Sequence, residues 1–340
     1  MGRSFSDYDE SDVRVRPGKG SRPRSKQRPA HHDAEFGLVV AKDRGRWGVV
    51  LDTGARLQCT RARELKRTSI EVGDRVGVVG DTSGDKDTLA RIVKRADRTS
   101  VLRRTADDTD PYERIIVANA ELMLIVVAAA DPPPRTGFVE RALIAAFVGG
   151  VTPVVCVTKT DLADPSDFER ELDAMGVDVL RTGVEDGVER LRERIAGRVS
   201  ALIGHSGVGK STLVNRIVPE ADRETGAVSG VGKGRHTSTQ SVALEVPGGG
   251  WIIDTPGIRS FGLAHVAPEE IVEVFPDLAK AAERCPRGCT HLGPPKDPEC
   301  AWDGLDTDSP VGRRATAVRG LLTALHSNND WELKQLDEDR

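Results

Sequence analysis

Residues 204–211 have the types and the spacing of a loop that binds phosphates. They read Gly204-His205-Ser206-Gly207-Val208-Gly209-Lys210-Ser211 and fit the pattern G-x-x-x-x-G-K-[ST]. Glycines at those positions let backbone N–H groups approach a nucleotide closely. The apolar run 199–203 predicts a strand before the loop, and residues 212–218 predict a helix after it, which is the context that this motif needs. The alternative is a glycine-rich turn without a ligand, which this context disfavours.

A nucleotide in this loop would be held mainly by the backbone. We expect the Lys210 ammonium to reach the β- and γ-phosphates and the Ser211 hydroxyl to bind Mg²⁺. The residues expected to contact the nucleotide here are Gly204, Ser206, Gly207, Val208, Gly209, Lys210, Ser211 and Thr212.

A second motif, Asp254-Thr255-Pro256-Gly257, follows the apolar run 251–253, as D-x-x-G follows a strand in GTPases. We expect Asp254 to orient Mg²⁺ through water and the Gly257 N–H group to sense the γ-phosphate.

A third motif, Thr158-Lys159-Thr160-Asp161, follows the predicted strand 152–157 and resembles the base-reading pattern N-K-x-D. The Asp161 carboxylate would accept two hydrogen bonds from N1–H and N2–H₂ of guanine, which adenine does not offer. Lys159 would lie along the base, while Thr158 replaces the usual Asn and removes one amide that braces the loop. These residues favour GTP over ATP, and an ATPase with a degenerate base motif is the alternative. Thr182-Gly183 is a weaker candidate for a shortened loop that supports the base.

The order of the three motifs is unusual. An ordinary GTPase has its phosphate loop first and its base motif late, whereas here the base motif comes first, then the phosphate loop, then D-x-x-G. That order describes a circular permutation, in which the same strands assemble around the same pocket. It also connects the segment after Gly257 directly to the last part of the chain, so that nucleotide state could tilt that part.

Three of the five cysteines lie close together near the C-terminus. The pattern Cys285-x₃-Cys289-x-His291-x₈-Cys300 offers three thiolates and one imidazole, a complete tetrahedral set for a structural Zn²⁺. The alternative is a small helical cap without metal. The other two cysteines fall inside predicted strands and are expected in the core, and this cysteine usage indicates a reducing compartment, the cytoplasm.

The elements that position these residues divide the 340-residue chain into four parts. Residues 1–34 are expected to be a disordered basic tail. Five short β-like runs within 35–104 predict an OB-fold barrel that binds RNA. Strands alternating with helices over 105–262 predict an α/β domain with a largely parallel sheet. Residues 263–340 are expected to form a zinc-binding helical domain, with helices over 268–275 and after Ser309-Pro310.

Charge is distributed unevenly. Residues 36–104 hold 16 Lys or Arg and 9 Asp or Glu, although the net charge of the whole chain is −4. The positive surplus indicates that this part of the chain binds a polyanion, RNA or DNA. The only aromatic residues in the runs are Phe36 and Trp47, so contacts with phosphates should dominate over stacking on bases. A barrel serving only as a lid, and a tail serving only solubility, remain alternatives.

No apolar run is long enough to span a membrane, and the polar N-terminus is not that of a secretory signal.

Taken together, the motif order, the barrel and the cysteine–histidine cluster closely resemble the circularly permuted GTPases that mature the small ribosomal subunit. The resemblance covers roughly residues 36–325 and extends to Gly234-Arg235-His236-Thr237-Ser238-Thr239, which is similar to that family's switch segment G-R-H-T-T-T. The cysteine gaps differ from the family's: the first is shorter by one and the last is longer.

The resemblance implies roles for residues that spacing alone does not assign. Thr237 would close over Mg²⁺, and His236 matches the family's suspected catalytic histidine. An apolar residue, Ile258, stands where many GTPases have a glutamine that orients water, so intrinsic hydrolysis would be slow. A neutral His236 imidazole could orient that water once the switch orders on a ribosome. The alternatives for His236 are an rRNA contact or a brace within the loop.

The fold class expected is therefore a circularly permuted P-loop GTPase domain of α/β type, with an N-terminal OB-fold barrel and a C-terminal α-helical zinc-binding domain. The resemblance implies a monomeric, Mg²⁺-dependent GTP hydrolase that binds the nascent small subunit through its rRNA, is stimulated by it and departs after hydrolysis. The alternative of another class is an RNA-binding scaffold that holds GTP or GDP as a structural switch and hardly turns over.

Overall fold

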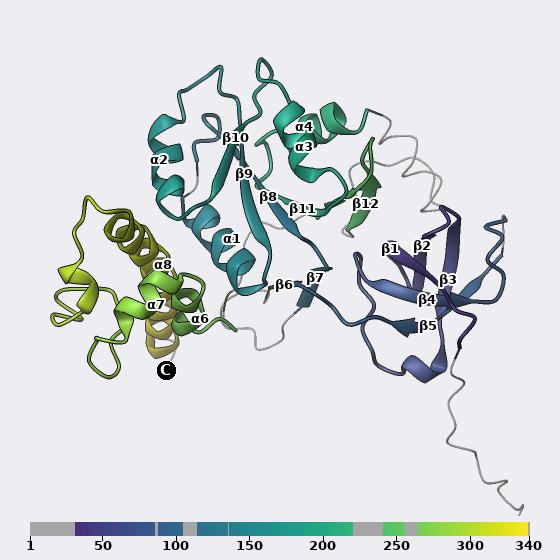
Figure 1. The fold of residues 1–340 in the computed structure, drawn as a ribbon, viewed down its shortest axis with the longest axis horizontal. Coiled ribbons are helices and arrows are strands. Elements are labelled where there is room, and N and C mark those ends of the chain that lie inside the picture. The colour runs from purple at the N-terminus through teal and green to yellow at the C-terminus, as the bar shows by residue number, and fades with distance from the viewer. Residues whose placement is uncertain are drawn as a thin grey trace, which may run out of the picture. The chain divides into compact units, whose positions relative to one another are not determined.

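A computed structural model describes residues 31–85, 88–104, 114–134, 136–219, 241–255, 263 and 265–338 (Figure 1). Within this part of the chain the elements fall into a barrel, a mainly parallel sheet with helices on both faces, and a group of C-terminal helices.

Five strands form the N-terminal barrel. They are β1 (Glu35–Asp43), β2 (Arg46–Leu51), β3 (Arg56–Arg61), β4 (Arg75–Val79) and β5 (Ala90–Arg95). They pair in the order β1-β2-β3-β5-β4, and β4 pairs back onto β1, which closes the barrel. Only the β3–β5 pair is parallel among these neighbours. The closed five-stranded arrangement agrees with the predicted OB-like barrel.

The packing of the barrel follows from strand periodicity and one close approach. Val76 and Val78, two residues apart on β4, point to the same face of the strand and lie fully buried in the barrel core. Gly37 on β1 leaves room for β2, because a Cβ there would lie 2.5 Å from the Val50 carbonyl oxygen.

The central sheet carries the strands that precede all three motifs. Its strands are β8 (Leu122–Ala128), β9 (Thr152–Thr158), β10 (Asp178–Arg181), β11 (Val199–Ile203), β12 (Val242–Glu245) and β13 (Trp251–Asp254). They lie in the order β10-β9-β8-β11-β13-β12, and β12 alone of these runs antiparallel to its neighbour. The phosphate-loop strand β11 therefore lies between β8, which precedes it in the chain, and β13, which follows it. One backbone pair, Ala41 with Val242, also links β1 to β12.

Alternating residues of β8 face two helical layers (Figure 1). Met123 and Ile125 belong to one core cluster with residues of α1 (Thr136–Val148) and α2 (Ser166–Ala174). Leu122 and Leu124 belong to another with residues of α3 (Glu189–Ile195) and α4 (Lys210–Ile217). All seven residues of β8 are buried, as expected of a strand covered on both faces.

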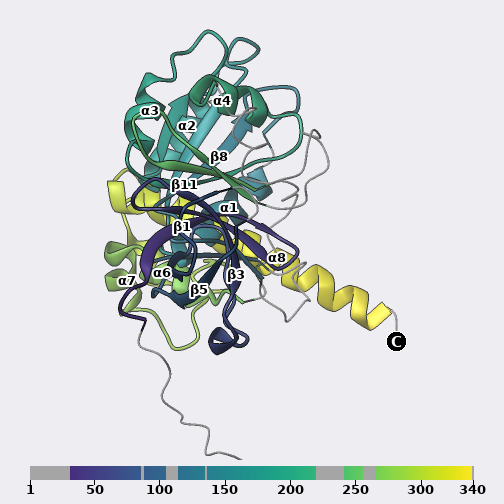
Figure 2. The ribbon, with the colours of Figure 1, turned by 90° about the vertical axis from the view of Figure 1, so that its right-hand side faces the viewer.

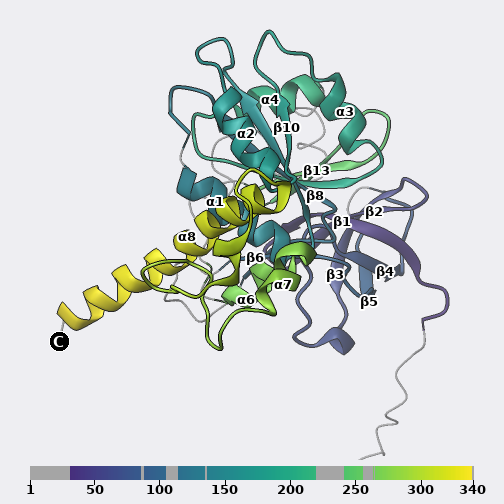
Figure 3. The same cartoon turned by 60° about the vertical axis from the view of Figure 1, so that its left-hand side comes forward.

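Short helices and one long helix form the C-terminal part. They are α6 (Pro268–Glu273), α7 (Pro276–Ala282), the 3₁₀ turn η4 (Ala301–Gly304) and α8 (Pro310–Glu338). The helix expected over 268–275 is α6, which ends at Glu273, and a separate helix, α7, begins at Pro276, where proline restricts the residue before it. Leu321 and Leu322 of α8 are buried in the same cluster as residues of α1, α6 and α7, and these helices lie together in Figure 3.

The yellow ribbon of α8 runs 29 residues toward the C-terminus (Figure 2). A short hairpin that the sequence only half predicted, β6 (Val101–Arg104) with β7 (Arg114–Ala118), precedes the central sheet. In the described ranges no helix has both the length and the apolar character required to cross a bilayer.

Candidate functional site

The loop between β11 and α4 has a backbone that only glycine fits. Gly204, Gly207 and Gly209 have φ angles of 153°, 84° and 92°. A Cβ on Gly204 would also lie 2.5 Å from the carbonyl oxygen of Val126. The glycine spacing thus reflects a tight turn that directs the following amides toward the start of α4, where anions are favoured by the helix dipole.

Lys210, the first residue of α4, folds back over this loop. Its Nζ donates to the carbonyl oxygens of Gly204 at 2.5 Å and His205 at 2.7 Å. Burial lowers the pKa of Lys210, and the charge of Asp254 opposes this shift. Burial likewise raises the pKa of Asp254, against the opposing effects of Lys210 and a backbone hydrogen bond from Thr255. The half-buried Lys210 cation and Asp254 carboxylate therefore lie close enough for their charges to interact, as binding of a phosphate and its Mg²⁺ requires.

The end of β13 places Asp254 at the same sheet edge. Asp254 is the register partner of Leu202 on β11, and the Thr255 hydroxyl donates to the Leu202 carbonyl oxygen at 2.7 Å. Thr255 is only 3% exposed, so this bond fixes the start of the segment that follows. The Ser211 and Thr212 side chains lie exposed on the first turn of α4.

The end of β9 is bonded directly to the phosphate loop. The Thr158 hydroxyl lies 2.6 Å from the carbonyl oxygen of Val208 and 3.2 Å from that of Val127, and its side chain is buried. One hydroxyl donates one hydrogen, and the shorter distance assigns it to Val208. A threonine hydroxyl thus makes a link between the base motif and the phosphate loop without the usual asparagine amide, which the sequence alone did not show.

Lys159 adopts a left-handed backbone conformation, with φ of 53°. Its Nζ donates to the carbonyl oxygen of Asp131, in the loop after β8. From the sequence this loop had no assigned role, and its contact with the base motif joins residues 28 apart, which no local pattern reveals. The Asp161 side chain is exposed just beyond this point, where a base could reach it.

The switch segment 234–239, with His236 and Thr237, lies outside the described ranges. So do Pro256, Gly257 and Ile258 after Asp254 and Thr255.

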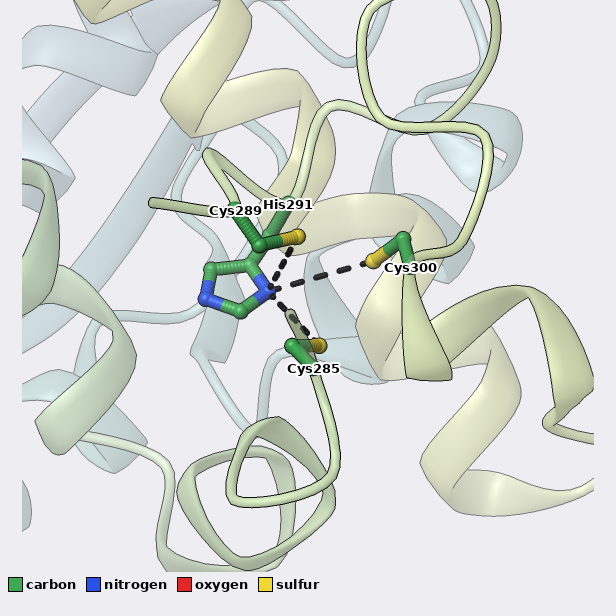
Figure 4. Close-up of side chains that lie close together, drawn as sticks. All are labelled: Cys285, Cys289, His291 and Cys300. Atoms are coloured by element: carbon green, nitrogen blue, oxygen red, sulfur yellow. Dashed lines mark hydrogen bonds between the residues drawn. The ribbon is translucent and has the colours of Figure 1, made fainter. Parts of the chain in front are cut away.

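The cysteine–histidine cluster is assembled in the C-terminal part (Figure 4). The Sγ atoms of Cys285, Cys289 and Cys300 lie 3.6, 3.6 and 3.9 Å from His291 Nδ1. Tetrahedral Zn²⁺, with Zn–S bonds of about 2.3 Å and Zn–N bonds of about 2.0 Å, separates sulfur from nitrogen by about 3.5 Å. The four side chains therefore fit one zinc ion with no position left for water.

The pKa values of two side chains in the cluster also agree with zinc binding. Burial, together with the neighbouring Cys300 and Cys285 thiols, raises the pKa of Cys289 to about 12. This thiol would therefore ionise at neutral pH only beside a cation. Burial also lowers the pKa of His291, which favours the neutral imidazole that a metal needs.

Groups around the cluster hold its ligands in place. The Asp297 carboxylate accepts hydrogen bonds from the Thr290 hydroxyl at 2.6 Å and from two backbone N–H groups of the same turn. From α8, Arg319 donates to the His291 carbonyl oxygen at 3.0 Å and lies 3.5 Å from Cys300 Sγ. The ring of His291 stacks on Trp302, with centroids 4.7 Å apart. Such outer contacts orient metal ligands and tune their basicity.

Comparison with known proteins adds an independent line of evidence. The profile of the RsgA GTPase family matches residues 95–264. A Bacteroides fragilis protein named small ribosomal subunit biogenesis GTPase RsgA is 34% identical over 283 residues, covering 78% of this chain and 88% of that protein. A protein of the same name from Gemmatimonas aurantiaca is 35% identical over 278 residues, covering 78% and 89%.

Solved structures agree with the fold. YjeQ from Thermotoga maritima superposes with a TM-score of 0.58 at 27% identity, covering 85% of this chain and 98% of that one. YloQ, described as a circularly permuted GTPase, superposes with a TM-score of 0.59 at 23% identity, covering 87% and 97%. The second likeness concerns the fold alone.

Proposed function

This chain belongs to the RsgA GTPase family, and we propose that it hydrolyses GTP during late maturation of the small ribosomal subunit, binding that subunit and leaving it after hydrolysis. Relatives named small ribosomal subunit biogenesis GTPases support this role. The alternative of a scaffold that holds nucleotide without turnover is not favoured, because those relatives are named as GTPases.

One observation carries the proposal at the level of the site. The motifs, scattered along the chain, meet at one edge of the sheet: Thr158 bonds to Val208 of the phosphate loop, and Asp254 pairs in register with Leu202, two residues before that loop. We assign the phosphates of GTP to the loop 204–211 with Thr212, and the γ-phosphate contact to Gly257. We assign the guanine to Lys159 and Asp161, held by Thr158.

The chemistry follows from these positions. Lys210, displaced from the loop carbonyls, would neutralise the β- and γ-phosphates where charge develops during transfer. Ser211 and Thr237 would hold Mg²⁺, with Asp254 orienting its water, and the ion would supply positive charge at the phosphates. His236 would orient the attacking water once the small subunit is bound, in place of the glutamine that Ile258 replaces.

The remaining parts would hold the partner. We propose that residues 35–104 bind rRNA, that 105–262 form the GTPase domain and that 263–340 form the zinc domain, with 1–34 as a basic tail. The barrel's surplus of Lys and Arg supports a phosphate-dominated contact with rRNA. We further propose a monomer that acts in the cytoplasm, a location in keeping with five free cysteines.

The test is phosphate release from GTP by full-length Lys210→Ala, with and without purified small subunits. We expect turnover to fall by at least about a hundredfold, because the lysine meets the charge that develops in the transition state. Lys280→Ala, an exposed lysine of α7, is the matched control and should retain full activity. Equal turnover by Lys210→Ala and the control would refute the assignment of the site.

A further inference from the structure

The turn after β10 packs directly on the base motif. The backbone N–H of Thr182 donates to the Val157 carbonyl oxygen at 2.7 Å, which continues the strand pairing up to Thr158. A Cβ on Gly183 would lie 2.1 Å from Thr160 Oγ1 and 3.1 Å from the Thr160 backbone nitrogen. The two segments are therefore in contact with no side chain between them, and any larger residue at 183 would push them apart.

A single carboxylate oxygen joins the same two segments. Asp186 Oδ2 accepts a hydrogen bond from the Thr160 hydroxyl at 2.6 Å and another from the Gly183 backbone N–H at 2.9 Å. Thr160 directly precedes Asp161. Fixing Thr160 therefore restricts where the Asp161 carboxylate can point.

A guanidinium from the phosphate-binding helix reaches this turn from the other side. Arg216 of α4 donates through Nη1 to the carbonyl oxygens of Thr182 at 2.9 Å and Gly183 at 2.8 Å, and through Nη2 to that of Asp186. Helix α4 begins at Lys210 beside the phosphate loop, and Arg216 near its end contacts the turn after β10. The planar fork of arginine suits three acceptors in one turn, whereas a lysine would satisfy them poorly.

We propose that Asp186 and Arg216 form a clamp that positions the guanine-reading Asp161 relative to the phosphate loop. Neither residue touches the base; each acts through the turn 182–186, and they are positioning residues. The clamp connects the helix that holds the phosphates with the segment that reads the base. Purine discrimination by Asp161 thus depends on Arg216, 55 positions later in the chain. This inference rests on the guanine site proposed above.

The distinguishing experiment compares affinities for GDP and for inosine diphosphate, which lacks the 2-amino group that Asp161 would bind. The full-length protein binds GDP more tightly than inosine diphosphate if the base site is right. In Asp186→Ala we expect this preference to shrink about tenfold, because the loosened carboxylate loses its second hydrogen bond while the phosphate contacts stay. Arg216→Gln should shrink it in the same direction.

Two matched variants separate positioning from general damage. Asp186→Asn retains a carbonyl oxygen that accepts both hydrogen bonds, and it should restore most of the preference. Glu185→Ala changes the exposed neighbour on the same turn and should leave the preference at the wild-type value. If Asp186→Ala does not fold, Thr160→Val removes one donor of the same network and should shrink the preference too.

The outcomes are distinct. A wild-type protein without preference for GDP over inosine diphosphate overturns the guanine site itself. A wild-type preference that persists unchanged in Asp186→Ala overturns the clamp alone. Equal losses of affinity for both nucleotides also overturn it, because they would indicate a structural role without influence on base reading.

Discussion

Thr158 illustrates how one buried hydroxyl can join two functional loops. Its Oγ1 lies 2.6 Å from the Val208 carbonyl oxygen, inside the phosphate loop, and the side chain is 6% exposed. A shape-conserving change to valine would leave that carbonyl without its partner in a dry site, at a cost of about 1–3 kcal/mol.

We therefore predict that Thr158→Val releases GDP about ten times faster than the wild type, as measured by stopped-flow fluorescence of a labelled nucleotide. Thr158→Ser keeps the hydroxyl and serves as the control, with a release rate close to the wild type. A valine variant that releases GDP at the wild-type rate would show that the hydroxyl contributes nothing to nucleotide retention.

At the scale of single residues, the sequence predicted those site residues whose positions follow from local spacing along the chain. The glycines of the phosphate loop and the Cys285–Cys300 set are in this class, since the chemistry itself fixes their intervals. Arg216 and Asp186 are not, because their partners lie 26 to 34 residues away and any arginine or aspartate would look the same in the sequence.

Among the elements, helix α8 and the zinc cluster depend on one another. Arg319 of α8 donates to the His291 carbonyl oxygen, lies 3.5 Å from Cys300 Sγ and pairs with Asp303 at 2.6 Å. A cation beside the thiolates offsets their negative charge once zinc is bound, and outer contacts of this kind change metal affinity by about 10- to 100-fold.

We predict that Arg319→Ala loses zinc to a chromogenic chelator at least about ten times faster than the wild type. Arg313→Ala, an exposed position six residues earlier on the same helix, is the control and should release zinc at the wild-type rate. Indistinguishable release rates for the two variants would mean that Arg319 does not support the metal site.

Element boundaries could be predicted where periodicity was clear. The strand predicted over 152–157 is β9, and the apolar runs 199–203 and 251–253 are the strands β11 and β13, each within one residue of the expected bounds. Strand β6, with two arginines in four residues, has no such signal and forms through its pairing with β7. The helix expected over 268–275 appears as α6 and ends two residues early, before Pro276, which begins α7.

On the scale of the whole molecule, the switch segment and the ribosomal partner must act together. His236 is the proposed orienter of water, and its effect would appear only when the small subunit is bound. In the chain order the C-terminal part follows directly after the D-x-x-G motif, with α6 beginning at Pro268, and we expect nucleotide state to reach the subunit contact through this connection.

We predict that His236→Ala loses at least about nine-tenths of the small-subunit-stimulated phosphate release and retains the wild-type affinity for GTP, since general base or water-orienting groups contribute about 10²–10⁴-fold to rate. Lys233→Ala, three residues earlier, controls for changes in the same segment. Stimulation that survives intact in His236→Ala would remove the histidine from the mechanism.

The permuted order of the strands also determines the order in which the parts of the nucleotide site are synthesised. The ribosome synthesises β8, β9 and β10 before β11 and β13. The strands next to the proposed base site therefore leave the exit tunnel before the strands next to the phosphate loop. The nascent sheet has an open edge on β8 until β11 arrives to cover it. Guanine nucleotides in the cell can therefore stabilise this domain only after residue 254 has been synthesised, when nearly three quarters of the polypeptide already exists.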